Sequence, residues 1–260
     1  MANSGGQRSL VLVPGACLGG WVWREVADQL RGAGHDVYPV TLTGLGERVH
    51  LAHAGIDLET HVTDVVNLLE YNALEDVVLV GHSYAGVLVR AVVDRVPQRL
   101  NAAVYLDTSP LPDGMAIVDV QSPEQRERQR LAVEEHGDGW RWPVPDGETL
   151  KTGAFGSASG LRDEHLRLLA ELATPQPYAT MTSPLRLAHG GSGDTRRIAI
   201  FCAAGGIDVQ RLRELIADGD PRAATFADAD WELHDLPTGH WPMLSLPGPL
   251  ADLLHDIAAR

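Results

Sequence analysis

A segment in the first third of the chain combines a buried strand, a tight turn and the start of a helix. The run Val77-Val78-Leu79-Val80 is apolar and mostly β-branched, which is typical of a buried strand. Residues 87–93 then have the composition of a helix start. Between them lies Gly81-His82-Ser83-Tyr84-Ala85-Gly86, where one serine stands among glycine and alanine residues. A strand–turn–helix of this kind lifts the serine hydroxyl above the edge of a sheet, as a nucleophile elbow does.

The turn departs from the strict pattern Gly-x-Ser-x-Gly at its last position. Ala85 stands there, and Gly86 follows it. Small residues are needed because a larger side chain would collide with the neighbouring strand or helix, and alanine is small enough to be accommodated. The alternative interpretation is a serine in an ordinary connection between a strand and a helix.

Apolar runs that read as strands alternate with helical patterns along most of the chain. This alternation predicts an α/β fold with a mostly parallel central sheet flanked by helices. Right-handed crossovers then bring the carboxyl ends of the strands to one edge, where ligands bind. The expected strands are Ser9–Val13, Val37–Leu42, Val77–Val80, Ala102–Leu106, Arg197–Cys202 and Glu232–Leu236; the expected helices are Trp21–Arg31, one capped by Asp57 that ends near Tyr71, Val209–Ala217 and Pro249–Ala259.

The middle of the chain loses this alternation. Charged helical stretches lie at Pro123–His136 and Leu161–Ala173. We therefore expect a helical cap at residues 109–193, inserted into an α/β core made of 1–108 and 194–260.

Three aromatic residues of the expected cap have two interpretations. Trp140 and Trp142 lie in a proline-rich segment, and Phe155 follows it. They either line a pocket for an aromatic acyl or alcohol group or pack the cap against itself. The sequence favours neither.

A serine hydroxyl is a weak nucleophile near neutral pH and needs a base that is itself oriented by a carboxylate. The chain has 11 histidines. His240 is the best candidate base, because it follows the last expected strand in a turn shaped by Gly239 and Pro242. The alternative is an ordinary surface-loop histidine. His82 adjoins the serine, but we expect it to point away from the turn and to make a packing or polar core contact.

Two aspartates compete for the role of the acid. Asp107 ends the strand after the serine strand, although it could equally bond the turn Thr108-Ser109-Pro110. Asp208 follows the fifth strand, but it directly precedes a helix and an N-cap role explains it fully. We favour Asp107 and keep Asp208 as the alternative. A third interpretation is that no carboxylate orients His240.

An oxyanion hole needs two backbone N–H donors. Tyr84, directly after the serine, is expected to supply one. Ala16 is expected to supply the other, from the glycine-rich loop of residues 14–20 after the first strand. The alternative is that this loop is only a tight connection. Cys17 in the same loop is interpreted as a buried apolar residue rather than a nucleophile.

Composition excludes several classes of partner. The formal net charge is −14 and the pI is about 5.1, which argues against nucleic acids and anionic membranes. No run of roughly 18 or more apolar residues predicts a membrane span. The two cysteines, Cys17 and Cys202, form no disulfide framework, and the polar segment Met1–Gln7 lacks a signal-peptide profile. We expect a cytoplasmic protein with a small-molecule substrate and leave a homodimer open.

No cofactor motif is complete. Gly44-Leu45-Gly46 is too short for a dinucleotide fingerprint. His50 and His53 lack a third ligand at a suitable spacing, so we predict no metal site and no organic cofactor.

Three motifs together resemble the α/β-hydrolase family, and within it the branch of plant methyl-ester hydrolases, hydroxynitrile lyases and related bacterial esterases. The resemblance covers nearly the whole chain and is weakest in the expected cap. It implies Ser83 as the nucleophile, His240 as the base, and Ala16 and Tyr84 as the oxyanion donors. The motifs are Val13-Pro14-Gly15-Ala16-Cys17-Leu18-Gly19-Gly20-Trp21-Val22-Trp23, Leu42-Thr43-Gly44-Leu45-Gly46-Glu47-Arg48 and Gly81-His82-Ser83.

Departures from that branch bear on the acid and on the chemistry. The family's acid usually follows the fifth strand at a position that here falls on Gly205 or Gly206, which favours Asp107. The lyases carry a threonine and a lysine where this chain has Gly15 and Trp241, so the resemblance argues against a cyanohydrin lyase.

These observations predict a serine hydrolase that cleaves a small apolar or aromatic carboxylic ester through an acyl-enzyme. One alternative keeps the fold and site but uses them for lactone opening, C–C bond cleavage or cyclisation in secondary metabolism. Another is a non-catalytic small-molecule-binding module.

Overall fold

The computed structural model describes residues 7–153, 155–190, 195–228 and 230–260. A six-stranded sheet lies at its centre, and every neighbouring pair of its strands is parallel. The strand order β2-β1-β3-β4-β7-β8 requires crossovers in both directions from β1, as in other doubly wound sheets. The strands are β1 Ser9–Val13, β2 Asp36–Pro39, β3 Val77–His82, β4 Leu100–Leu106, β7 Arg196–Cys202 and β8 Trp231–Leu236.

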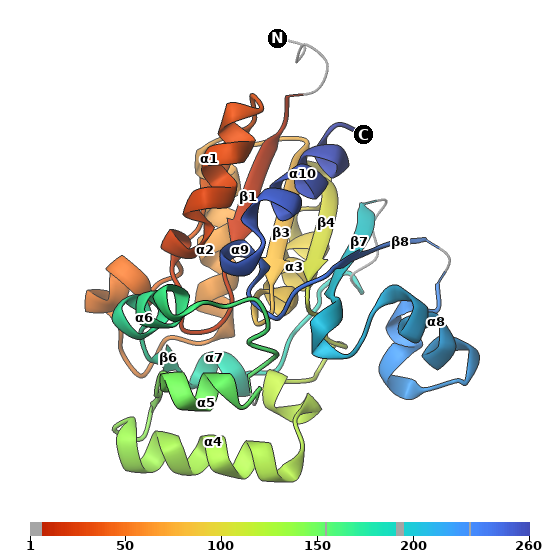
Figure 1. Cartoon of the computed structure of the whole chain (residues 1–260). Helices are drawn as coiled ribbons and strands as arrows, with labels where there is room; N and C mark the ends of the chain where they lie inside the picture. Colours follow the sequence, from red (N-terminus) through yellow and green to blue (C-terminus); the bar gives the residue numbers. More distant parts are fainter. Residues whose placement is uncertain (1–6, 154, 191–194, 229) are drawn as a thin grey trace.

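Helices cover both faces of the sheet (Figure 1). On one face lie α2 Leu58–Tyr71 and α3 Ala85–Arg95, and on the other lie α1 Arg24–Gly32 and α10 Pro247–Ala258. The remaining elements of the core are α8 Val209–Ala217, α9 Pro242–Ser245 and the 3-10 turns η1 Gly20–Trp23, η2 Gly46–Leu51, η3 Pro97–Arg99, η5 Ala203–Gly205 and η6 Pro221–Phe226.

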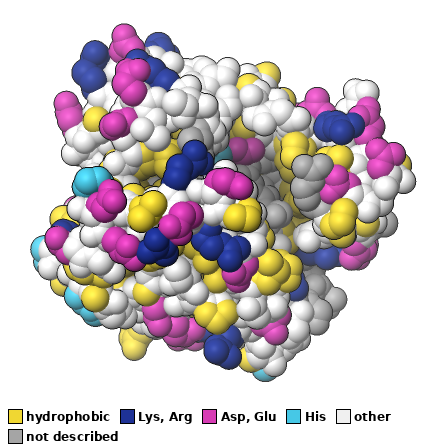
Figure 2. Space-filling view, turned by 90° about the horizontal axis from the view of Figure 1, so that it is seen from below, with side chains coloured by type: hydrophobic (Ala, Val, Ile, Leu, Met, Phe, Trp, Pro, Cys, Tyr) yellow, Lys and Arg dark blue, Asp and Glu magenta, His cyan; other side chains and the backbone are white. Residues whose placement is uncertain are grey.

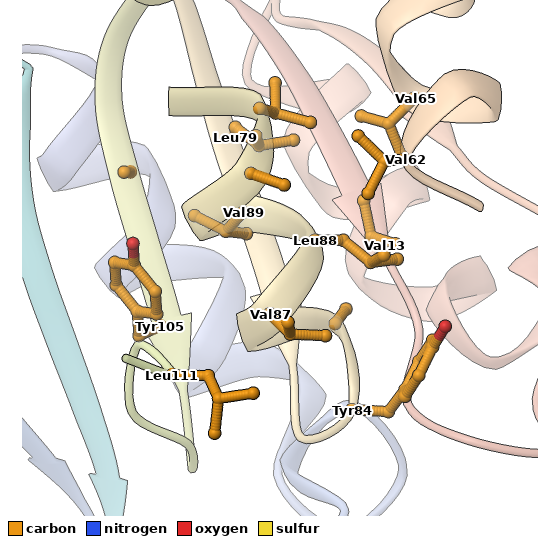
Figure 3. Close-up of a cluster of buried hydrophobic side chains, with 14 of the residues drawn as sticks. Val13, Val62, Val65, Leu79, Tyr84, Val87, Leu88, Val89, Tyr105 and Leu111 are labelled. Carbon is orange, nitrogen blue, oxygen red and sulfur yellow. The ribbon is translucent and has the colours of Figure 1, made fainter. Parts of the chain in front are cut away.

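The sheet has an apolar core on each side because successive side chains of a strand point to opposite faces. In β3, Val77 and Leu79 belong to the core under α2 and α3, whereas Val78 and Val80 belong to the core under α1 and α10. Figure 3 shows the first of these cores, in which α3 packs between β3, β4 and α2. This double burial explains the continuous apolar runs of the sequence.

The segment between β4 and β7 contributes no strand to the six-stranded sheet within the described residues. It lies below the carboxyl ends of the strands in Figure 1. A capping box at Ser122 starts its longest helix. Its elements are η4 Ile117–Val120, α4 Pro123–His136, α5 Gly147–Lys151, α6 Asp163–Leu172 and α7 Ala179–Thr182, with β5 Arg141–Trp142 antiparallel to β6 Gln176–Pro177.

The predicted fold class is correct, and so are most of the predicted elements. Asp57 caps α2 as expected, since its carboxylate accepts the Thr60 N–H at 2.9 Å. The division into a core of 1–108 and 194–260 and a cap of 109–193 stays a prediction. Its second boundary lies outside the described residues, as does the N-terminal segment 1–6 that argued against a signal peptide.

Several element boundaries were wrong, including the start of β4 at Leu100 rather than Ala102 and the end of β3 at His82 rather than Val80. The second strand ends at Pro39 rather than Leu42. The Val40 N–H still donates to the Leu12 carbonyl of β1, but from Thr41 on the chain binds other segments. Thr41 accepts the Gly20 N–H on its hydroxyl and the Arg48 guanidinium on its carbonyl. The first helix begins as the 3-10 turn η1, α6 is shorter than predicted because residue 162 is extended, and α10 begins two residues early.

Candidate active site

The turn between β3 and α3 holds Ser83 in a backbone conformation that non-glycine residues rarely adopt. Its φ is +52°, in the left-handed region. The Ser83 N–H donates to the Leu106 carbonyl at 3.0 Å, and the Ser83 carbonyl accepts the Gly86 N–H at 3.0 Å. The surrounding hydrogen bonds therefore hold the strained turn in place.

The glycines of this turn are required by close approach of the neighbouring segments. A Cβ atom on Gly81 would lie 2.4 Å from a methyl group of Val89. One on Gly86 would lie 2.6 Å from the Thr108 hydroxyl oxygen. Ala85 is fully buried and fits at the position between them, so the departure from the strict motif leaves the turn intact.

Ser83, His240 and Asp107 form one hydrogen-bonded chain. His240 Nε2 lies 2.9 Å from Ser83 Oγ, and His240 Nδ1 lies 2.5 Å from Asp107 Oδ2. The second oxygen of Asp107 accepts the Cys202 N–H at 3.0 Å. Each member follows a strand of the sheet, so the topology itself brings together residues that are far apart in sequence.

Electrostatics favour the ionised form of the Asp107 carboxylate in this hydrogen-bonded triad. Burial of Asp107 opposes ionisation, but the hydrogen bonds from His240 and the Cys202 N–H, together with the charge interactions with the nearby histidines, outweigh it and hold the pKa of Asp107 below its ordinary value. An ionised Asp107 accepts the proton on Nδ1 of His240. Nε2 is then free to accept the Ser83 hydroxyl proton, which is the arrangement that a general base requires.

Asp208, the alternative acid, has another partner. It caps α8, where its carboxylate accepts the Arg211 N–H at 2.7 Å. The structure thus pairs His240 with Asp107 and pairs Asp208 with its own helix. The catalytic roles of these residues stay predictions.

Two backbone N–H groups near Ser83 are available as anion donors. In the described part of the chain, neither the Ala16 nor the Tyr84 N–H donates to a protein group. The Tyr84 side chain belongs to the apolar core under α2 and α3 (Figure 3). Its hydroxyl lies 2.8 Å from Nδ1 of the buried His61. This anchor fixes the residue whose N–H we expect to face the oxyanion.

His82 makes a polar core contact, as expected, but its ring does not point away from the site: it lies against the His240 ring, with the two centroids 4.7 Å apart. Its Nε2–H donates to the His240 carbonyl at 2.7 Å, which ties the base-bearing loop to the serine turn. Burial lowers the pKa of His82 to about 3, so the ring is neutral. Cys17 is buried as expected, and burial raises the pKa of its thiol to about 12.

A small cavity of about 90 Å³ opens on Ser83 and His240. The loop at residues 15–18 forms one wall, and side chains from the segment between β4 and β7 form the opposite wall. Apart from the three polar site residues Ser83, His82 and His240, its lining is apolar: Gly15, Ala16, Cys17, Leu18, Trp142, Val144, Pro145, Leu150, Phe155, Leu169, Ala173 and Trp241.

The aromatic residues of the predicted cap divide between the two interpretations. Trp142 and Phe155 line the cavity and also contact each other, with ring centroids 5.4 Å apart. Trp140 does not line it and instead lies against the Arg141 guanidinium. Sequence reasoning missed Leu150 and Leu169, because apolar residues on short cap helices do not reveal which face meets the site.

Two larger grooves lie beside the cavity. One of about 820 Å³ separates α8 and η6 from residues 151–153 and 156–159 and reaches Asp107 but not Ser83; Figure 2 shows it as a hollow. The other, of about 460 Å³, runs along α4 and shares Trp142, Val144, Pro145 and Phe155 with the small cavity.

Among the residues that the structure describes, no group of three or more His, Cys, Asp or Glu side chains is arranged to hold a metal ion. No helix in the described ranges is long and apolar enough to cross a membrane.

Comparison with known proteins identifies the class. A model of the alpha/beta hydrolase family matches residues 10–253, so the chain belongs to that family. The chain is 35% identical over 257 residues to the carbendazim hydrolyzing esterase of Nocardioides sp. (strain SG-4G), covering 95% of this chain and 98% of that protein. It is 28% identical to methylesterase 9 of Arabidopsis thaliana, covering 96% and 98%. The predicted family and branch are confirmed.

Solved structures share the fold at lower identity. An extracellular alpha/beta-hydrolase from a Paenibacillus species superposes with a TM-score of 0.78 at 20% identity, covering 96% of this chain and 98% of that one. Tomato methylketone synthase I, in complex with 2-tridecanone, gives a TM-score of 0.72 at 19% identity, covering 97% and 98%. Both support the α/β-hydrolase architecture.

Proposed function

We propose that this protein is a serine hydrolase that cleaves a small, uncharged carboxylic ester through an acyl-enzyme. One observation carries the proposal: the hydrogen-bonded chain from Asp107 through His240 to Ser83 ends at a small apolar cavity. The esterase and methylesterase names of the relatives support the same class of reaction.

The proposed mechanism follows from the geometry. Ser83 Oγ attacks the ester carbonyl carbon while His240 Nε2 takes the hydroxyl proton. The carbonyl oxygen becomes an oxyanion and accepts the N–H groups of Ala16 and Tyr84. The tetrahedral intermediate collapses, and the alcohol leaves with the proton that His240 returns. Water, activated by His240, then hydrolyses the acyl-enzyme to release the acid and regenerate Ser83.

The cavity argues for the kind of substrate. Its walls are apolar, and among the side chains that line it the only titratable ones besides Cys17 are the two histidines of the site. Burying a charged group there without a partner would be costly, so the part of the substrate that enters is uncharged. A volume of about 90 Å³ admits only a small group on that side of the ester.

A covalent probe tests the proposal directly. We would incubate the protein with a fluorophosphonate and measure intact mass for wild type, Ser83→Ala, Asp107→Asn and Asp208→Asn. The expected result is one label on wild type, none on Ser83→Ala, and slow labelling of Asp107→Asn alone among the aspartate variants. An unlabelled wild type would overturn the proposal and favour a binding module.

Product analysis separates hydrolysis from the alternatives that use the same fold. An acid and an alcohol in equal amounts are expected from a carboxylic ester. Ring opening without a second product, C–C cleavage or a cyclised product would each point to one of the alternatives.

We also propose that residues 109–193 act as a cap over the cavity and that the protein works in the cytoplasm. The first rests on the cap side chains that line the cavity, and the second on the low cysteine content. Whether the chain forms a homodimer is decided by its mass in solution from light scattering.

A further inference from the structure

The loop that carries Ala16 is held from the segment between β4 and β7. Cys17, the next residue, has φ +66°, a left-handed conformation that costs free energy for a residue with a side chain. Its N–H donates to Oε1 of Gln176 at 2.9 Å, and its carbonyl accepts the Thr174 N–H at 2.9 Å. Both backbone groups of the strained residue are therefore bound by residues about 160 positions away.

The Gln176 side chain is itself fixed by burial and by a hydrogen bond. It is fully buried, and its Nε2 donates to Thr180 Oγ1 at 2.8 Å. The Thr180 hydroxyl donates its proton to the Pro177 carbonyl at 2.6 Å, so it can only accept a hydrogen bond from the Gln176 amide. This contact fixes the amide orientation with Oε1 toward Cys17.

The two hydrogen bonds that Gln176 and Thr174 make with Cys17, here called the clamp, control the direction of the neighbouring Ala16 N–H. The Cys17 N–H belongs to the peptide unit that joins Ala16 to Cys17, so its hydrogen bond to Gln176 restricts the orientation of that unit. The φ and ψ angles of Ala16 relate this unit to the preceding one, which carries the Ala16 N–H. Oxyanion stabilisation is sensitive to such direction, because the donor must meet the charge that develops in the transition state.

We propose that Gln176 is a positioning residue for the oxyanion hole, which it sets by holding Cys17 in its left-handed conformation. The inference rests on the proposed esterase function. It makes the segment that covers the cavity a working part of catalysis, since the hole keeps its geometry only while that segment is docked.

The test compares Gln176→Met with a matched control. Methionine has a similar volume and no acceptor for an N–H. The control is Gln129→Met, because Gln129 is also a buried glutamine of this segment but lies on α4 away from the loop. We would measure kcat, KM and the inhibition constant of a trifluoromethyl ketone, which forms an oxyanion with the serine.

We expect the variant to lose binding of the transition state while it keeps binding of the substrate in the ground state. Gln176→Met lowers kcat by at least about tenfold and weakens ketone inhibition by a similar factor, with KM within about twofold of wild type. Gln129→Met changes none of the three. Replacing Cys17 by glycine, which adopts a left-handed φ without strain, should shrink the Gln176→Met loss by at least about threefold.

The inference is overturned by wild-type behaviour of Gln176→Met or, if that variant does not fold, of Thr180→Val. Both results differ from failure of the proposed esterase function. Wild-type kcat and ketone affinity in Gln176→Met would show that the clamp does not set the hole. Should that variant not fold, Thr180→Val frees the amide and must show a smaller loss of the same kind. A wild type that fails to react with the fluorophosphonate would overturn the esterase proposal itself, and the oxyanion role with it.

Discussion

Backbone strain at single residues marks the candidate site. Six non-glycine residues in the described part of the chain have positive φ, and three of them are Ser83, Cys17 and Asp107. Ser83 is the candidate nucleophile, Cys17 adjoins a candidate oxyanion donor, and Asp107 is the candidate acid. Strained residues persist only where the surroundings over-determine them, and here hydrogen bonds hold all three.

Substitution of each candidate acid by asparagine separates the roles of the two residues. Asp107→Asn replaces the carboxylate that holds the Nδ1 proton of His240, so we expect kcat to fall about 10³- to 10⁴-fold. Asp208→Asn should leave kcat within about twofold, because asparagine also caps helices well. Initial rates on a 4-nitrophenyl ester measure both. Equal losses in the two variants would contradict the pairing of His240 with Asp107.

Buried neutral histidines make the fold sensitive to acid. Burial lowers the pKa of His82 to about 3 and also lowers that of His61, whereas the same residues in the unfolded chain titrate near their ordinary value of 6.5. Between those values the unfolded state binds more protons, so the free energy of unfolding falls as pH drops. Each histidine contributes up to about 1.4 kcal/mol per pH unit.

Urea unfolding between pH 7 and pH 4.5 measures this slope. The His82→Gln variant cannot titrate at that position, and its amide can still donate to the His240 carbonyl. Its stability should therefore fall less steeply with acid than that of wild type. Parallel slopes in the two proteins would show that His82 titrates alike in the folded and unfolded states.

At the scale of elements, the loop that bears His240 is held by the segment at residues 156–159. The His240 N–H donates to the Ser157 carbonyl at 2.8 Å, and the Gly239 N–H donates to the Ser159 carbonyl at 3.0 Å. Gly156 packs so closely that a Cβ on it would lie 2.5 Å from Cγ of His240. The candidate base is thus positioned partly by residues 156–159.

Alanine at two glycines tests this contact. Gly156 and Gly153 both have positive φ, so alanine strains either backbone, but only at Gly156 does the new methyl group meet the His240 ring. We expect Gly156→Ala to lower kcat by at least about tenfold and Gly153→Ala to leave kcat near wild type, with similar losses of stability in both. Melting temperatures and initial rates give the comparison, and matching kcat values would disprove the effect on the base.

Sequence patterns predicted the elements of this fold better than the contacts between them. Strands buried on both faces leave continuous apolar runs, and the helix at Pro123–His136 carries its own capping signals, so local chemistry suffices for both. The clamp on Cys17 and the contact of Gly156 with His240 join segments more than 80 residues apart. No local pattern encodes such pairings, because the partners lie on separate segments of the chain.

For the molecule as a whole, the sheet edge gathers candidates that the sequence separates by up to 157 residues. Sequence reasoning could name Ser83, His240 and Asp107 because parallel topology sends every strand end to one edge. It could not give the shape of the cavity, which depends on how side chains of the covering segment meet the core. That shape, rather than the hydrogen-bonded chain, is what selects among esters.

The wall between the small cavity and the groove along α4 yields the last prediction. Phe155 is one of four residues that line both spaces, of about 90 and 460 Å³. Removing its ring in Phe155→Ala should join them and let longer acyl chains reach Ser83. We expect the ratio of kcat/KM for 4-nitrophenyl octanoate over acetate to rise at least about tenfold, since each added methylene that finds apolar contact contributes binding. Trp140→Ala is the control because Trp140 lines neither space. An unchanged ratio in Phe155→Ala, or an equal rise in the control, would mean that the acyl chain does not pass this wall, and the groove of about 820 Å³ that reaches Asp107 would be the next route to test.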